Sequence, residues 1–415
     1  MSRPAIDPLA GELVAIVAPP LTRRPGRTMP SIGRILRRLA VSLAVVTASA
    51  VPALAAGYDS KAPYAILIDE DSGAVLYRKG DDIPFDPAAM VKMMTMAVVF
   101  DAIAAGEISL DQAFPVSENA WRTGGAPSGS ATMFAALKSS VPVSDLLRGA
   151  IVQAGNDACL ILAEGIAGSE AAFVRRMNDK ASALRLAGST FTNVTGLGDP
   201  AQKVTARDLA TIADYLITHH PELYRIYAEP DFTWNKIYQR NRNPLLGAGL
   251  GVDGLSTGST PEAGFGMTLS AVQDGHRTTL VVAGLPSEKD RTDEAKRLLG
   301  YAGSGFERVR FFAAGDPVAN ARVFGGIKGT VPLATHEPLD VLIEKGVRAP
   351  IRARAIYTGP LVAPVRKDQQ VGVVRVWTDD DKVFEKPVFT TEAVGVGSMS
   401  QRAIDAVGQL LIGWL

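Results

Sequence analysis

Three short stretches of the sequence hold polar side chains among apolar neighbours. PAAMVKMMT contains Lys92, IVQAGNDAC contains Asn156, and GVDGLSTGST contains Thr257 and Gly258. A lysine amine can take up a proton, and amide and hydroxyl groups can hold a substrate. Each stretch also has a simpler structural interpretation. Lys92 could be an ordinary helix lysine, Asn156 the cap of a helix starting at Asp157, and Thr257-Gly258 the end of a strand.

In their shared order, these stretches resemble the exported D-alanyl-D-alanine carboxypeptidases, which are low-molecular-mass penicillin-binding proteins. VSENAWRTGG, LLRGAIVQ, ARDLA and NRNPLL extend the resemblance, which covers about residues 64–310. The chemistry of that family rests on S-x-x-K, S-x-N and K-T-G motifs. The resemblance implies that the first serine loses its proton to the lysine one helical turn away and attacks a D-Ala-D-Ala peptide, giving an acyl-enzyme. It also implies that S-x-N holds the substrate amide and that K-T-G steadies the terminal carboxylate.

In this chain each motif lacks its most reactive residue. The S-x-x-K position has no serine, the S-x-N position has no serine, and the K-T-G position has no lysine. The replaced positions are Ala89, Ala154 and Ser256, and the retained residues are Lys92, Asn156, Thr257 and Gly258.

These replacements predict a catalytically inactive homologue. Ala89 has only a methyl group and cannot form an acyl-enzyme, and no other serine stands three residues before a lysine. Loss of the nucleophile costs another serine hydrolase about 10⁶ in turnover. With serine at position 256 in place of the K-T-G lysine, a cation is lost, and hydrogen bonds to charged groups contribute roughly 1.5–3 kcal/mol. We therefore expect Asn156 and Thr257 to bind a wall peptide weakly at most. Three alternatives stay open: an active serine-type carboxypeptidase of peptidoglycan biosynthesis with other machinery, an engineered knock-out of one, or retained residues that serve packing alone.

Periodicity and turn signals predict the elements that must position these residues. The expected order is two strands around a turn at 71–73, an apolar helix over 89–106, two helices around a break at 155–156, helices capped by Ser169 and Thr205, a hairpin about 274–275 and a helix around 292–301. The resemblance implies an α/β (α+β) fold of the penicillin-binding-protein and β-lactamase type. It consists of an antiparallel sheet flanked by helices and a helical lobe, followed by a small all-β domain.

The chain is expected to divide into four parts. These are an N-terminal extension and signal peptide over residues 1–56, a peptidase-like domain over 57–311, a small β-rich domain over 312–392 and an amphipathic helix over 393–415. The signal peptide is indicated by basic residues from Arg34 to Arg38, an apolar run, and small residues at Ala53-Leu54-Ala55. The run is too short and too often interrupted for a membrane anchor. We therefore expect export to the periplasm.

Composition excludes several other classes of protein. Lysine plus arginine and aspartate plus glutamate number 43 each, so the chain lacks the basic excess of a nucleic-acid-binding protein. Cys159 is the one cysteine and is expected to be a small buried hydrophobe. The four histidines form no H-E-x-x-H motif, and no metal or cofactor is expected.

The expected partners are a peptidoglycan stem peptide or a cell-wall protein, with peripheral inner-membrane contact through the helix over 399–415. The apolar face of that helix comprises Ile404, Val407, Leu411 and Trp414.

Overall fold

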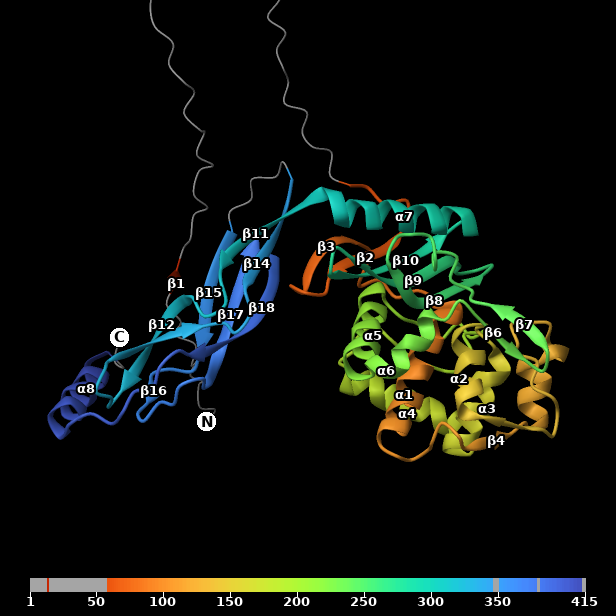
Figure 1. Cartoon of the computed structure of the whole chain (residues 1–415), viewed down its shortest axis with the longest axis horizontal. Helices are drawn as coiled ribbons and strands as arrows, with labels where there is room; N and C mark the ends of the chain where they lie inside the picture. The colour runs from red at the N-terminus through yellow and green to blue at the C-terminus, as the bar shows by residue number, and fades with distance from the viewer. Residues whose placement is uncertain (1–12, 15–57, 346–350, 379–380, 413–415) are drawn as a thin grey trace, which may run out of the picture.

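The computed structural model describes residues 13–14, 58–345, 351–378 and 381–412 (Figure 1). The predicted signal peptide lies outside the described residues. Of residues 1–56, the structure describes Leu13–Val14, which form the short strand β1. No helix in the described part of the chain combines the length and the apolar character that crossing a membrane requires.

The first unit is built on a five-stranded antiparallel sheet with the order β3-β2-β10-β9-β8. Its strands are β2 (Tyr64–Asp69), β3 (Ala74–Lys79), β8 (Val252–Thr260), β9 (Gly264–Gln273) and β10 (His276–Leu285). The predicted turns at 71–73 and 274–275 are confirmed. Gly73, Asp274 and Gly275 all have positive φ angles, which lets the chain reverse between neighbouring strands.

Helices cover both faces of this sheet (Figure 1). α7 (Glu288–Gly305) packs on one face, where Leu298 joins Leu67 and Leu280 in a common core. α5 (Ala206–His219) and the helical lobe pack on the other face, into which the alternate strand residues Ile66 and Val281 point. The sheet is therefore the middle layer of three, and its edge strand β8 borders the helical lobe.

The helical lobe contains the predicted apolar helix. This helix begins as a 3₁₀ turn, η1 (Ala88–Val91), and continues as α1 (Lys92–Ala104). α1 is buried on nearly all sides, which explains its lack of a polar face. The predicted caps are confirmed, because Ser169 Oγ accepts the N–H of Ala172 at 3.2 Å and Thr205 Oγ1 accepts that of Asp208 at 3.0 Å. The other elements are β4 (Ala113–Pro115), η2 (Ala120–Gly124), η3 (Ala126–Ser128), β5 (Ser140–Pro142), α2 (Val143–Ile151), α3 (Asn156–Ala167), α4 (Glu170–Ala183), α6 (Pro221–Tyr224), η4 (Arg225–Ala228), β6 (Asp231–Trp234) and β7 (Ile237–Arg240).

The second unit is a small β domain, and its first strand begins at Phe306, directly after α7 and before the predicted boundary at 312. A two-stranded sheet pairs β11 with β14, and a larger sheet has the order β1-β15-β17-β18-β13-β12-β16. The strands are β11 (Phe306–Phe312), β12 (Pro317–Phe324), β13 (Thr330–Ala334), β14 (Leu339–Glu344), β15 (Ile351–Tyr357), β16 (Leu361–Val362), β17 (Gln370–Thr378) and β18 (Asp381–Thr390). A separate core of valine and leucine side chains holds these strands together.

A C-terminal helix follows the β domain, and it begins at Met399 rather than at the predicted residue 393. α8 (Met399–Ile412) lies beside β12, and Asp405 Oδ2 accepts the N–H of Gly325 at 2.8 Å. Ile404 is 71% exposed and Val407 is 57% exposed. The helix thus docks on its own domain by a polar contact while two apolar side chains face solvent.

Candidate active site

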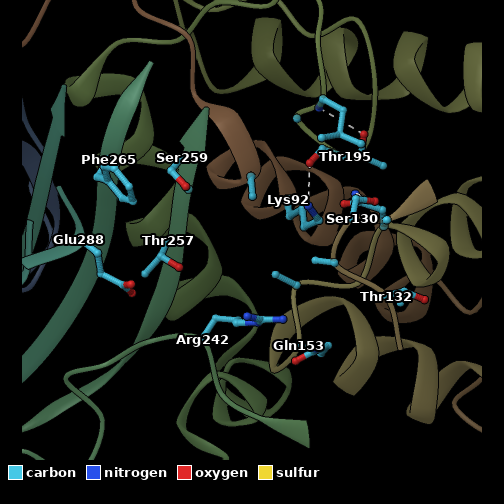
Figure 2. A pocket seen from close by; sticks show the side chains of 18 of the residues that line it. Lys92, Ser130, Thr132, Gln153, Thr195, Arg242, Thr257, Ser259, Phe265 and Glu288 are labelled. Atoms are coloured by element: carbon cyan, nitrogen blue, oxygen red, sulfur yellow. Dashed lines mark hydrogen bonds between the residues drawn. The ribbon is translucent and has the colours of Figure 1, made fainter. Parts of the chain in front are cut away.

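A surface cavity of about 580 Å³ lies between edge strand β8 and the helical lobe (Figure 2). Six of the seven residues singled out from the three motifs line it: Ala89, Lys92, Ala154, Asn156, Thr257 and Gly258. Ser256 stands next to this cavity and is not part of its lining. The fold therefore brings together three stretches that lie far apart in the sequence.

Lys92 is buried at the start of α1, with its amine reaching the cavity wall (Figure 2). Lys92 Nζ donates a hydrogen bond to the carbonyl oxygen of Thr195 at 2.6 Å. Burial lowers the pKa of Lys92, and the nearby Cys159 and Asp157 oppose the shift. An amine in such surroundings is suited to accept a proton. Ala89, one turn earlier, offers no hydroxyl that could give one.

Main-chain atoms of η1 pack directly against β8 at Gly258. A Cβ at Gly258 would lie 2.8 Å from the nitrogen of Ala89 and 2.9 Å from the oxygen of Pro87, so only glycine fits there. Ser256, two residues earlier on β8, has its Oγ 3.5 Å from the carbonyl oxygen of Ala89. The S-x-x-K and K-T-G positions are thus held in contact without help from a lysine at 256.

Asn156 is the first residue of α3, and its side chain does not cap that helix. The preceding Gly155 is the cap residue, and within the first turn it is Asp157 Oδ1 that accepts the N–H of Ala158, at 3.0 Å. Asn156 Nδ2 instead donates to Ser130 Oγ at 3.0 Å. Its amide oxygen is buried without a hydrogen-bond partner in the described part of the chain. The capping interpretation of Asn156 is therefore wrong, because the side chain turns toward the cavity.

Ala154 adopts a left-handed backbone conformation, with φ of 56°. This conformation is uncommon for a residue with a Cβ and lets the chain turn sharply between α2 and α3. The turn places Ala154 and Asn156 on the cavity wall together. Local backbone geometry, rather than a serine at this position, keeps the segment in place.

Asp157 holds the loop that forms the opposite wall. Its buried carboxylate accepts hydrogen bonds from Thr132 Oγ1 at 2.6 Å, from the N–H of Met133 at 2.9 Å and from the N–H of Ala135 at 3.1 Å. Hydrogen bonds to a charged acceptor are stronger than those between neutral groups. The loop therefore presents Ser130 to the cavity from a fixed base.

Sequence reasoning missed Arg242, which extends into the cavity (Figure 2). The backbone N–H of Arg242 donates to the carbonyl oxygen of Val152 at 3.0 Å. This bond ties the main chain at Arg242 to the segment just before the S-x-N position. No ion pair holds the Arg242 side chain within the described residues. The stretch NRNPLL belonged to the resemblance, but a single arginine in a loop gave no spacing signal for a role. A second cation in the cavity lining, Arg291, is buried and already donates to Glu288 at 2.8 Å.

Cys159 is fully buried behind Lys92, as expected for a small hydrophobe. Burial raises the pKa of its thiol to about 12, so the thiol stays protonated near neutral pH. No group of three or more histidine, cysteine, aspartate or glutamate side chains within the described ranges is arranged to hold a metal ion.

Comparison with known proteins identifies the family. The D-alanyl-D-alanine carboxypeptidase family matches residues 47–287, and the family described as the C-terminal domain of penicillin-binding protein 5 matches residues 306–396. D-alanyl-D-alanine carboxypeptidase DacC of Escherichia coli (strain K12) is 37% identical over 394 residues, which cover 93% of this chain and 98% of the relative. DacA of Haemophilus influenzae is 39% identical over 333 residues, which cover 80% of this chain and 84% of the relative.

Solved structures give the same result. Penicillin-binding protein 5 of Haemophilus influenzae superposes with a TM-score of 0.71 at 37% identity, covering 81% of this chain and 98% of that one. DacD of Francisella tularensis superposes with a TM-score of 0.65 at 28% identity, covering 82% of this chain and 95% of that one. The predicted α/β fold with a following β domain is confirmed. The chain belongs to the D-alanyl-D-alanine carboxypeptidase family.

Proposed function

We propose that this chain is a catalytically silent member of its family, which binds the D-Ala-D-Ala end of a peptidoglycan stem peptide weakly and does not hydrolyse it. The observation that carries the proposal is the methyl group of Ala89 on the cavity wall beside Lys92. The amine that would accept a proton is present, and the hydroxyl that would supply one is absent.

The cavity retains groups that suit a short peptide. The buried amide oxygen of Asn156 lacks a partner in the described structure, and a peptide N–H could supply one. The Thr257 hydroxyl and the Arg242 guanidinium line the same cavity, and a guanidinium can pair with a terminal carboxylate (Figure 2). Arg242 thus provides a cation where Ser256 has none to offer.

Labelling by a fluorescent penicillin tests the absence of catalysis. The purified chain should form no covalent adduct and should release no D-alanine from a pentapeptide, because Ala89 cannot be acylated. A folded relative that has serine at this position serves as the positive control. A stable adduct on any serine of residues 57–310, or measurable release of D-alanine, would overturn the proposal.

Saturation-transfer NMR tests the binding. A blocked tripeptide ending in D-Ala-D-Ala should give a transfer signal, and the same peptide ending in L-Ala-L-Ala should give a weaker one. Arg242→Gln should reduce the signal, whereas Lys289→Gln on the exposed face of α7 should leave it unchanged. Equal signals from both peptides would contradict recognition of the D-Ala-D-Ala end.

The proposed location is the periplasm, with peripheral contact at the inner membrane. Support for export comes from the signal-peptide pattern in the sequence. Support for membrane contact comes from α8, on which Ile404 and Val407 are exposed, as is Met399 at the start of the helix. Exposed apolar side chains on a helix are suited to lie in a lipid headgroup region.

A further inference from the structure

We infer that Lys92 is a covalent binding site for small aldehydes that carry a carboxylate, which it captures as an imine. This role differs from the proton transfer implied by the S-x-x-K motif and does not depend on peptide binding. In this role the lysine is a nucleophile. Ala89, which lines the cavity with Lys92, has only a methyl group, so it forms no hydrogen bond with the amine and leaves space for a ligand.

The surroundings of Lys92 favour an uncharged amine. The residue is 4% exposed, and its amine has the Thr195 carbonyl oxygen, a neutral group, as its hydrogen-bond partner in the described structure. No carboxylate in that part of the chain forms an ion pair with Lys92. Asp157, whose charge influences it, accepts hydrogen bonds from Thr132 and from backbone N–H groups instead. Burial lowers the pKa of Lys92, and its place in the first turn of a helix disfavours positive charge further.

The reaction balances without an oxidant or a reductant. The lone pair of the neutral amine attacks the aldehyde carbon and forms a C–N bond, while the C=O electron pair moves to oxygen and takes up a proton. The resulting carbinolamine loses water, with the second amine hydrogen leaving as a proton, to give a C=N bond. Aldehyde and amine thus become imine and water. A lysine desolvated in a pocket is a recognised nucleophile for carbonyl groups.

The cavity indicates which aldehydes would be captured. Arg242 extends into the same cavity as Lys92, without an ion-pair partner among the described residues (Figure 2). A guanidinium selects a carboxylate, and the hydroxyls of Ser130 and Thr257 can hydrogen-bond the carbinolamine oxygen. The chemical class is therefore an oxo acid with an aldehyde at one end and a carboxylate at the other.

Reductive trapping tests the assignment on the full chain. The protein is incubated at pH 7 with succinic semialdehyde and sodium cyanoborohydride, and the modified residues are found by peptide mass mapping. Lys92 should be modified faster than Lys289, an exposed lysine paired with Asp293, since burial lowers the pKa of Lys92 and so raises the fraction of its amine that is neutral. The preference should vanish in urea. Modification of Lys92 at or below the rate of Lys289, or modification confined to the α-amino group, would overturn the inference.

Two substitutions separate the amine from the carboxylate pocket. Lys92→Arg should abolish the fast modification and Lys289→Arg should leave it unchanged; if Lys92→Arg does not fold, the peptide map of the unsubstituted chain decides. Arg242→Gln should slow trapping of succinic semialdehyde and leave butyraldehyde, the uncharged analogue of the same length, unaffected. Equal effects on both aldehydes would overturn the selection of a carboxylate by Arg242.

Discussion

Ser256 Oγ lies 3.5 Å from the carbonyl oxygen of Ala89, so two of the three replaced positions stand side by side in the folded chain. They are separated by most of the peptidase-like domain in sequence and meet because β8 packs against η1. A nucleophile restored at 89 and a cation restored at 256 would therefore flank the same point in the cavity.

Restoring all three replaced residues should restore activity. The variant Ala89→Ser, Ala154→Ser, Ser256→Lys should bind fluorescent penicillin covalently and release D-alanine from a pentapeptide, because Lys92 and Asn156 already line the cavity. Catalytic groups that act as a unit are strongly non-additive, so the single variants should fall far below the triple one. Ala89→Ser alone should acylate slowly, and Ser256→Lys alone should give no turnover. A folded triple variant without activity would show that the cavity differs from an active one at further positions.

Gly258 should be intolerant of a side chain. In Gly258→Ala the new Cβ would meet backbone atoms of Pro87 and Ala89, so β8 and η1 must separate. We expect a loss of about 1–3 kcal/mol in the free energy of unfolding, measured in urea. Gly300→Ala on α7 is the matched control, since a Cβ there meets nothing nearby, and it should stabilise by up to about 1 kcal/mol. Equal stability of the two variants would contradict the close packing of β8 on η1.

Glu70 should make stability depend on pH. Burial raises the pKa of Glu70 from 4.5 to about 7, with Asp214 and Asp69 adding to the shift and Arg277 opposing it. Between pH 4.5 and about 7, the Glu70 carboxyl is ionised in the unfolded chain and keeps its proton in the folded chain. Stability contributed by this group is therefore complete below about pH 4.5 and falls as pH rises toward 7.

Glu70→Gln should remove that loss. The variant should gain up to about 3 kcal/mol over the parent chain at pH 8 and little at pH 4.5, measured by urea unfolding across the pH range. Glu262→Gln, in the exposed turn between β8 and β9, is the control and should not alter the pH profile. A parallel shift of both variants at every pH would contradict the assignment to Glu70.

Membrane contact should depend on the apolar side chains of α8. The chain from Tyr58 onward should float with liposomes, whereas the same chain ending at Gly397 should not. Ile404→Glu with Val407→Glu should abolish flotation, and Ser400→Glu, also exposed, should not. Because Arg402 is the one cation from 399 to 412, flotation should change little with anionic lipid content. Equal flotation of the full and shortened chains would instead favour a helix that serves only its own domain.

The sequence predicted the scaffold of the site better than the groups that complete it. The helix at Lys92, the break at Gly155 and the hairpin at Gly275 follow from periodicity and turn residues, which act locally. Arg242 and the Thr195 carbonyl could not be found that way, because loops bring them to the cavity from segments without a regular period. The capping prediction for Asn156 failed because a tertiary contact with Ser130 replaced a local one.

The cavity is shaped largely by main-chain atoms. Gly258 brings the backbone of β8 onto η1, and a Cβ at Gly196 would lie 1.9 Å from the carbonyl oxygen of Ala88, so a second loop closes on η1 in the same way. Side chains that perform chemistry can therefore be exchanged while the contour of the pocket is kept. A non-covalent ligand selected for shape should not distinguish this chain from relatives that have the serine. An acylating drug should react with those relatives and not with this chain. Acylation by this chain would therefore not lower the free concentration of the drug.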